Sequence, residues 1–202
     1  DAFDFKIIND DVERQIEVFR PDIVGISSVS QNFNKAIAYA AIAKKRGLPV
    51  ICGGVHISML PESLTADMDV GVIGEGERTI CDLMGIYIAQ KRFAAEDLRR
   101  IKGVVYRDNG KISVTEMQLP IQQLDNLPRP ARDLLEVTKE TFMFTSRGCP
   151  YRCAFCASSR FWHKIRFFSA EYVVDEIAEL IVKYGVENIN FQDDLFSADV
   201  QR

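Results

Sequence analysis

The sequence predicts an α/β protein: a doubly wound, Rossmann-like parallel sheet, then a β-hairpin with a linker, then the first βα units of a second α/β domain. Three observations support this prediction. Short apolar runs alternate with amphipathic helical segments through residues 1–100. A hairpin pattern interrupts the alternation within residues 101–138, and a strand, loop, helix, strand order resumes within residues 139–202. Strands that alternate with helices are typical of parallel sheets.

The first domain is expected to contain four strands separated by helices. The run Asp22–Ser28 is apolar on both faces, as in a strand buried in a parallel sheet. Asn34–Arg46 carries apolar residues at helical spacing and is followed by Gly47, a residue type that commonly ends helices. Small residues follow the expected strands, at the edge where an open α/β sheet binds its ligand. The expected strands are residues 3–8, 22–28, 49–52 and 70–73.

Residues 101–138 have the pattern of a β-hairpin followed by a proline-rich linker. The Asn109-Gly110 pair, flanked by β-branched residues, is a strong hairpin-turn signal. Three prolines between Leu119 and Pro130 favour an extended linker. Beyond the linker, a strand is expected at residues 141–146, a helix at 170–184 and another strand at 188–191.

Composition narrows the function classes and the compartment. The formal net charge of −4 argues against a general nucleic-acid partner. No window approaches the roughly 18 apolar residues that a membrane-spanning helix requires, and no targeting segment opens the chain. The five cysteines are an odd number, with three of them close together, which favours a reducing cytoplasmic location over a disulfide scaffold.

Three cysteines directly after the strand at 141–146 form the strongest candidate site: Cys149, Cys153 and Cys156. Thiolates at this spacing can converge on one soft metal. One interpretation is a structural zinc site completed by a residue such as His163. The other is an iron–sulfur cluster whose fourth iron, without a cysteine, stays open for a ligand. Cys52 and Cys81 are poor ligand candidates because both fall in the core pattern of the first domain.

Positive charge around this loop favours the cluster. Between Lys139 and Arg166 the only acidic residue is Glu140. A cluster held by three thiolates is anionic and a ligand carboxylate adds further negative charge, so a basic surround stabilises it. A zinc site with three thiolates carries less negative charge than such a cluster with its ligand carboxylate, so it needs a basic surround less. The basic residues are Lys139, Arg147, Arg152, Arg160, Lys164 and Arg166.

The spacing Cys149-x-x-x-Cys153-x-x-Cys156, with Phe155 before the last cysteine, resembles the signature of radical S-adenosylmethionine (SAM) enzymes. The resemblance implies a 4Fe-4S cluster on the three cysteines, with SAM chelated by the open iron and cleaved reductively to a 5′-deoxyadenosyl radical. By the same resemblance Phe155 would lie against the adenine, and Asp193 and Asp194 would bind the methionine amino group. The alternative for the two aspartates is a helix cap or a turn.

The first domain resembles the cobalamin-binding domain that often precedes such a core. The matching stretches are Ser27-Ser28, then Gly53-Gly54 with His56, then Gly74-Glu75-Gly76. Small residues at strand ends let the backbone approach a large planar ligand and its nucleotide tail. We expect His56 to contact the corrin edge or cap a helix rather than to ligate cobalt.

Three functional hypotheses follow. The first is a cobalamin-dependent radical SAM enzyme that performs methyl transfer or oxidative or cyclising chemistry. The second keeps the radical chemistry but leaves the first domain without a corrinoid. The third is a non-enzymatic protein that binds zinc through three cysteines and a histidine, or binds a corrinoid.

The radical readings imply a small-molecule or peptide substrate and a one-electron donor such as flavodoxin or ferredoxin. The resemblance covers nearly the whole chain, but only about two βα units of the catalytic barrel. We therefore expect the chain to be a truncated fragment that is inactive by itself.

Overall fold

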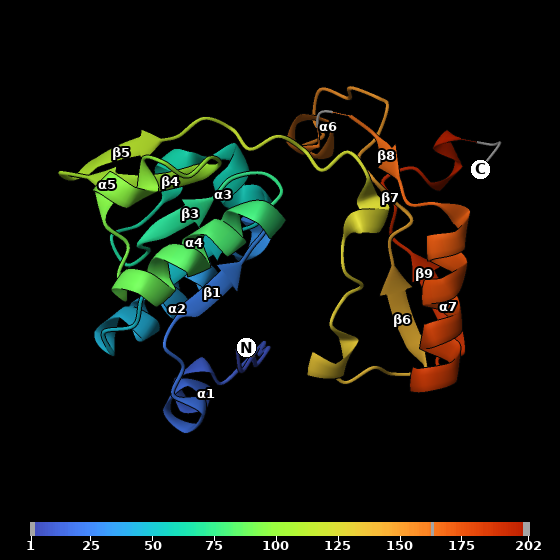
Figure 1. Cartoon of the computed structure of the whole chain (residues 1–202), viewed down its shortest axis with the longest axis horizontal. Helices are drawn as coiled ribbons and strands as arrows, with labels where there is room; N and C mark the ends of the chain where they lie inside the picture. Colours follow the sequence, from blue (N-terminus) through green and yellow to red (C-terminus); the bar gives the residue numbers. More distant parts are fainter. Residues whose placement is uncertain (1–2, 163, 200–202) are drawn as a thin grey trace. The chain divides into compact units, whose positions relative to one another are not determined.

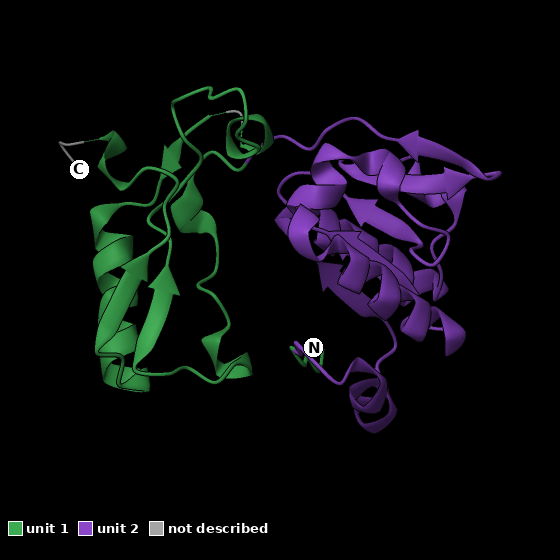
Figure 2. Cartoon of the chain, turned by 180° about the vertical axis from the view of Figure 1, so that it is seen from behind, with its two compact units in different colours: residues 1–7, 121–202 green, residues 8–120 purple. Residues whose placement is uncertain are grey.

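The computed structural model describes residues 3–162 and 164–199 of the chain. The chain divides into two compact units, residues 8–120 and residues 121–202 together with 1–7 (Figure 2). The hairpin lies with the first unit and most of the predicted linker with the second. The division into domains at residues 1–100, 101–138 and 139–202 stays a prediction.

The first unit is built on a five-stranded sheet in the order β1-β2-β3-β4-β5 (Figure 1). The first three strands are parallel, and the last two add to the sheet as an antiparallel hairpin. At the turn of this hairpin, Asn109 and Gly110 both have positive φ, 51° and 80°, as a tight hairpin turn requires. The strands are β1 (Val24–Ser27), β2 (Val50–Gly53), β3 (Val70–Val72), β4 (Val104–Asp108) and β5 (Lys111–Val114).

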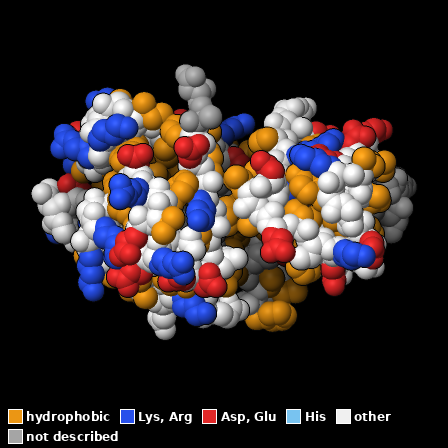
Figure 3. All heavy atoms as spheres, turned by 90° about the horizontal axis from the view of Figure 1, so that it is seen from below, with side chains coloured by type: hydrophobic (Ala, Val, Ile, Leu, Met, Phe, Trp, Pro, Cys, Tyr) orange, Lys and Arg blue, Asp and Glu red, His pale blue; other side chains and the backbone are white. Residues whose placement is uncertain are grey.

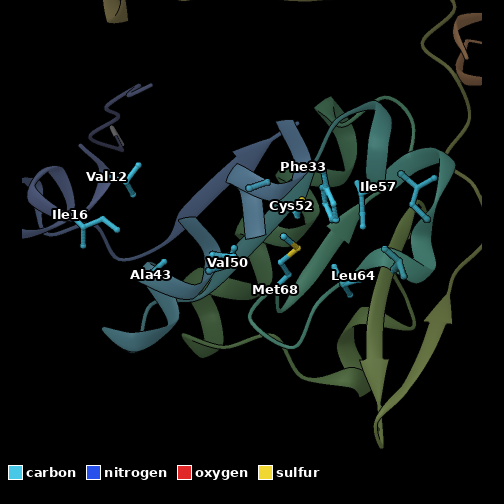
Figure 4. Packing of buried hydrophobic residues seen from close by; sticks show 13 residues of the cluster. Val12, Ile16, Phe33, Ala43, Val50, Cys52, Ile57, Leu64 and Met68 are labelled. Atoms are coloured by element: carbon cyan, nitrogen blue, oxygen red, sulfur yellow. The ribbon is translucent and has the colours of Figure 1, made fainter. Parts of the chain in front are cut away.

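Helices cover both faces of this sheet. Successive residues of β2 show this directly, because Val50 belongs to one buried cluster and Ile51 to the other. The first cluster joins the sheet to α1 (Val12–Phe19), α2 (Phe33–Lys45) and α3 (Val55–Met59) (Figure 4). The second joins it to α4 (Glu77–Gln90) and α5 (Ala95–Leu98). The sheet is therefore the middle layer of three, which confirms the predicted α/β class.

The prediction of a strand at residues 3–8 is wrong. These residues are in no strand, and the first regular element is α1. A strand exists only when a neighbour accepts its hydrogen bonds, and alternation of Phe3, Phe5 and Ile7 does not supply one. Helix α1 is held instead to the end of α2, where Arg46, the residue after the helix, pairs with Glu13 at 2.8 Å and Glu17 at 2.7 Å.

The second unit contains one parallel βαβ element. Strands β6 (Glu140–Met143) and β9 (Asn188–Phe191) pair in parallel through the crossover helix α7 (Ala170–Tyr184). The Ser169 hydroxyl accepts a hydrogen bond from Tyr172 N at the start of α7, and Gly185, with φ 66°, ends the helix. The core between them centres on Met143, Leu180 and Val186.

Shorter elements complete the chain. Strands β7 (Ser146–Arg147) and β8 (Arg166–Phe167) form an antiparallel ribbon, and helix α6 (Ser158–Phe161) lies between them in sequence. No helix within the described ranges is long and apolar enough to cross a membrane. The 3₁₀ turns are Ser30–Asn32, Pro61–Ser63, Leu124–Asn126, Arg132–Leu134 and Phe196–Ala198.

Much of the predicted linker is fixed to the second unit. Arg132 and Glu176 form an ion pair at 2.7 Å, with side chains only 15% and 6% exposed. Arg166 donates to the carbonyl of Ile121, and Ser169 N donates to the Asp125 carboxylate. These contacts hold the linker against α7 and β8, so the segment is ordered by packing.

Candidate functional site

The cysteine loop, which we define as residues 148–157, joins β7 to α6 beyond the carboxyl end of β6. Gly148 opens it with φ 91°, a conformation that side chains rarely adopt. A Cβ atom at this position would lie 2.9 Å from Trp162 Cβ and 3.0 Å from Lys164 O. The chain after α6 therefore packs directly on the start of the loop, and only glycine allows this approach.

The three candidate ligand thiols are free. Cys149 and Cys156 are partly exposed and Cys153 is exposed. Over the described residues, no three Cys, His, Asp or Glu side chains lie close enough together to hold a metal ion. The sequence therefore places the three cysteines on one loop, but the structure does not bring their sulfur atoms to one point. His163, the alternative zinc ligand, lies outside the described residues.

The loop nevertheless has the donors and the space for a cluster. A hollow of about 380 Å³ is lined by Arg152, Cys153, Ala154, Ser159 and Arg160. Three reduced thiols are the ligands that iron–sulfur clusters use, and two guanidinium groups favour an anion beside them. Phe155 is 93% exposed, so its ring is available to a ligand. The chemistry of the donors fits the predicted group, although the thiols must still converge.

The basic surround is smaller than the sequence suggested. Lys139 precedes β6, at the opposite end of the strand from the cysteines, and pairs with Glu187 at 2.6 Å. Arg166 is buried and donates to Ile121 O. Arg147 and Arg166 both lie over the Trp162 ring, 5.5 and 5.9 Å from its centre. Of the six cations, Arg152 and Arg160 are the two that line the hollow.

Asp193 and Asp194 follow β9 and bond to the segments that flank the cysteine loop. Asp193 Oδ1 accepts from Thr145 N at 2.7 Å and Ser146 N at 2.8 Å, and Oδ2 accepts from Thr145 Oγ1 at 2.5 Å. The Asp194 carboxylate accepts from the Ser158 hydroxyl. Both aspartates thus lie near the loop, as expected, and the binding of a methionine amino group by them stays a prediction.

The first unit has its own candidate site where β1, β2 and β3 end. Ser28 N donates to Gly53 O at 3.1 Å, and His56 N donates to Ser28 O at 3.3 Å. Gly54, at φ 95°, is pressed against β1: a Cβ there would lie 2.5 Å from Ser28 O and 3.0 Å from Ser27 Oγ. The structure therefore brings together Ser27, Ser28, Gly53, Gly54 and His56, which the sequence predicted as one site.

Ser58 connects this edge to the next strand, and sequence reasoning missed it. Its hydroxyl donates to Gly54 O at 2.8 Å and accepts from Gly74 N at 3.0 Å. The two glycine loops are thus held together by one side chain. Its only signal in the sequence was a polar residue four positions after Gly54, on a short helix. Glu75 and Gly76 follow directly, and Gly76 precedes the first residue of α4.

His56 is fixed by its neighbours. Its ring stacks on buried Phe33 with centres 3.8 Å apart, and Nδ1 lies 3.0 Å from Ser30 Oγ. The side chain therefore braces α3 against the turn after β1. His56 thus lies within α3 rather than in a loop, and its contact with a corrin stays a prediction.

A buried hydroxyl at this edge fits a bound ligand. Ser28 is 4% exposed, and its Oγ has no hydrogen-bond partner among the described residues. A buried hydroxyl without a partner is costly unless a ligand or water satisfies it. Val29, Leu60 and Met117, which follow β1, α3 and β5, are exposed apolar side chains. Apolar rims with a few polar groups are typical of cofactor sites.

Two further observations correct or refine the cysteine assignments. Cys52 is fully buried in the first cluster, as predicted, and burial raises the pKa of its thiol to about 11. Cys81 is exposed on α4, so its placement in the core was wrong. It lies outside the apolar stripe of α4, in which Leu83 and Tyr87 are buried.

On the face drawn in Figure 3, positive and negative side chains are interspersed over the described part of the chain.

Comparison with known families covers both candidate sites. Residues 2–84 match the B12 binding domain, and residues 143–199 match the radical SAM superfamily. Residues 143–199 thus carry the radical SAM match. The B12 binding match precedes the radical SAM match, so the predicted resemblance and the order of its two parts are confirmed.

Similar proteins include methyltransferases and a cyclase. An uncharacterized methyltransferase of Pyrococcus horikoshii is 35% identical over 95% of this chain and 44% of its own length. The anaerobic magnesium-protoporphyrin IX monomethyl ester cyclase of Rubrivivax gelatinosus is 31% identical over 92% and 36%. The cytidylyl-2-hydroxyethylphosphonate methyltransferase of Streptomyces wedmorensis is 26% identical over 97% and 44%. The chain thus spans less than half the length of these curated relatives.

Solved structures support the fold. The radical SAM methyltransferase TsrM of Kitasatospora setae, with tryptophan and a SAM analogue bound, matches 93% of this chain and 40% of its own at a TM-score of 0.72 and 19% identity. A second TsrM structure, with cobalamin and a [4Fe-4S] cluster bound, matches with a TM-score of 0.68 and 18% identity. These matches confirm the architecture of the chain.

Proposed function

We propose that this chain is part of a cobalamin-dependent radical SAM enzyme that performs methyl transfer, with oxidative or cyclising chemistry as the second candidate. The observation that carries the proposal is the pairing of two sites in one chain. One is the edge of the first sheet with the unpartnered hydroxyl of Ser28. The other is the loop with three free thiols beside Arg152 and Arg160.

In this proposal the candidate residues in and beside the cysteine loop have separate tasks. Cys149, Cys153 and Cys156 hold the 4Fe-4S cluster, and Arg152 and Arg160 attract the carboxylate of SAM. Phe155 supplies a ring against which the adenine stacks. The exposure of Phe155 and the arginines that line the hollow support these roles.

The edge of the first sheet would hold the corrinoid. Ser28 donates or accepts a hydrogen bond at the nucleotide tail, and Gly53, Gly54 and Gly74 leave room for the tail to pass the backbone. Ser27, His56, Glu75 and Gly76 line the same edge. When bound, the reduced cluster would supply the electron that cleaves SAM to a 5′-deoxyadenosyl radical, and the corrinoid would supply a methyl carrier.

The partners follow from this chemistry. The enzyme would take electrons from a one-electron donor such as flavodoxin or ferredoxin, and it would act in the cytoplasm, where thiols stay reduced. Its substrate would be a small molecule or a peptide. The relatives named above support methyl transfer first, because two of the three are methyltransferases.

The deciding experiment is anaerobic reconstitution of the full-length protein with iron and sulfide. We expect a brown protein with about four irons per chain that cleaves SAM after reduction. Cys153→Ala should abolish iron binding, whereas Cys81→Ala, at an exposed cysteine of the first unit, should leave it unchanged. A colourless protein that holds one zinc would contradict the proposal. Titration with hydroxocobalamin then separates the corrinoid-dependent enzyme from a radical enzyme without a corrinoid.

A further inference from the structure

We propose that Asp193 and Asp194 are positioning residues that hold the two ends of the cysteine loop. Asp193 bonds to the residues before the loop, and Asp194 bonds to a residue directly after it. The identification of the loop as a cluster site rests on the proposed function. The clamp itself is a feature of the protein without any cofactor, and it can be tested there.

Asp193 replaces strand pairing at the point where the chain leaves one sheet for another. The pairing of β6 with β9 ends at Met143, and the ribbon of β7 with β8 begins at Ser146. Thr145 and Ser146 are each 2% exposed, so their N–H groups need partners inside the protein. The Asp193 carboxylate accepts from both, at 2.7 and 2.8 Å.

Both oxygen atoms of Asp193 are used in this way. Oδ1 accepts the two backbone N–H groups, and Oδ2 accepts the Thr145 hydroxyl at 2.5 Å. Hydrogen bonds to a carboxylate are stronger than those between neutral groups. The amino group of a ligand would have to compete with these three donors, so the structure favours positioning over direct ligand binding for Asp193.

Asp194 acts at the other end of the loop. It accepts from the hydroxyl of Ser158, the first residue of α6 and the second after Cys156. Ser159 Oγ donates to Cys156 O at 3.2 Å, and Cys156 N donates to Cys153 O at 3.1 Å. The second half of the loop is therefore linked to the end of β9 through a short series of hydrogen bonds.

Fixing both ends lowers the conformational entropy that the loop loses when its thiols converge. The close approach of Trp162 to Gly148 also restrains the first residue of the loop, which lowers the same entropy cost. A residue that is already ordered loses less conformational entropy when the loop closes. Since Asp193 contacts residues 145 and 146 and Asp194 contacts residue 158, the dipeptide restrains both flanks of all three cysteines.

The test is hydrogen exchange in the reduced, cluster-free, full-length protein, read by mass spectrometry on peptides that cover residues 144–160. Asp193→Asn should speed exchange at residues 145 and 146 by about tenfold, because one charge-assisted hydrogen bond is worth about that factor. Asp194→Asn should speed exchange at residues 156–160 instead. Alkylation of Cys149 and Cys156 should become faster in both variants.

Two further variants keep the result interpretable. Thr145→Val removes one donor to Asp193 and should also speed exchange, whereas Thr145→Ser keeps the hydroxyl and should restore the wild-type rate. The matched control is Glu187→Gln, which removes a carboxylate just before β9 that pairs with Lys139. It should leave residues 144–160 unchanged.

The proposal is overturned if Asp193→Asn exchanges like Glu187→Gln, or if Thr145→Val matches Thr145→Ser. Unchanged exchange combined with weaker SAM binding would instead assign the aspartates to the ligand. Failure of the full-length protein to bind iron would refute the proposed function but leave the exchange results intact. The two failures are therefore distinguishable.

Discussion

The glycine pair after β2 gives the sharpest test of the first site, because its two members are in opposite situations. Gly54 has φ 95° and ψ −179°, a region that glycine alone adopts readily. A methyl group there would lie 2.5 Å from Ser28 O and 2.8 Å from Ser28 N. Both are backbone atoms and cannot rotate away. At Gly53 an added Cβ has nothing within 4 Å.

The expected cost of Gly54→Ala follows from these contacts. The backbone conformation costs about 1–3 kcal/mol for a residue with a side chain. Relief of the clash separates β1 from the turn after β2 and weakens the bond from His56 N to Ser28 O, which adds about 1 kcal/mol. We expect a total loss of about 2–4 kcal/mol and a fall in the melting temperature of roughly 10 °C or more for a domain of this size.

Gly53→Ala is the matched control, since it makes the same chemical change one residue earlier. Its stability should stay within about 1 kcal/mol of wild type. Its methyl group points into open space at the edge where we place the corrinoid, so the affinity for hydroxocobalamin should fall by about tenfold or more. Thermal and urea unfolding measure the first effect, and spectroscopic titration measures the second. Equal stability of the two variants would refute the reasoning.

Three further predictions concern single buried groups. Ser28→Ala removes a hydroxyl without a partner among the described residues. The free energy of unfolding, measured in urea, should therefore stay unchanged or rise. The affinity for hydroxocobalamin, measured by titration, should fall. Glu176→Gln breaks the buried pair with Arg132 and should destabilise the protein by about 3 kcal/mol in urea unfolding, unlike Glu187→Gln at an exposed pair. Cys52, with a pKa raised by burial from near 9 to about 11, should resist iodoacetamide at pH 8 while exposed Cys81 and Cys153 react. Because its folded pKa is the higher one, the stability that its neutral thiol contributes is complete below pH 9 and is lost as the pH rises towards 11.

Local signals predicted the regular elements well. The crossover helix was expected at residues 170–184 and occupies Ala170–Tyr184, because Ser169 and Gly185 determine its ends by local hydrogen bonds and backbone conformation. The hairpin followed from Asn109-Gly110, whose positive φ values are also a local property. The strand expected at residues 3–8 failed because strand formation depends on a neighbour far away in the sequence.

The candidate site was predictable in its residues and less so in its geometry. The cysteine spacing and the small residues at strand ends are sequence patterns, so both candidate sites could be located in the sequence. The bond from Thr145 to Asp193 joins residues 48 positions apart, and nothing local indicates it. Lys139 was counted with the basic surround because it is near Cys149 in sequence, but a strand separates the two in space. Ser58 was missed because its role depends on two loops that meet only after folding.

The two sites differ in how far the protein alone has built them. At the sheet edge, Gly54, Ser58 and Ser28 are held by backbone hydrogen bonds and close contacts, so a ligand would meet an ordered surface. At the cysteine loop Asp193 and Asp194 hold the flanking residues, and among the described residues the three thiols do not meet at one point. Metal binding to such a loop contributes the ordering of its ligands. A substitution that disturbs the packed part of the sheet edge, such as Gly54→Ala, should therefore lower stability. Substitutions of the loop cysteines should instead change iron content while the fold persists.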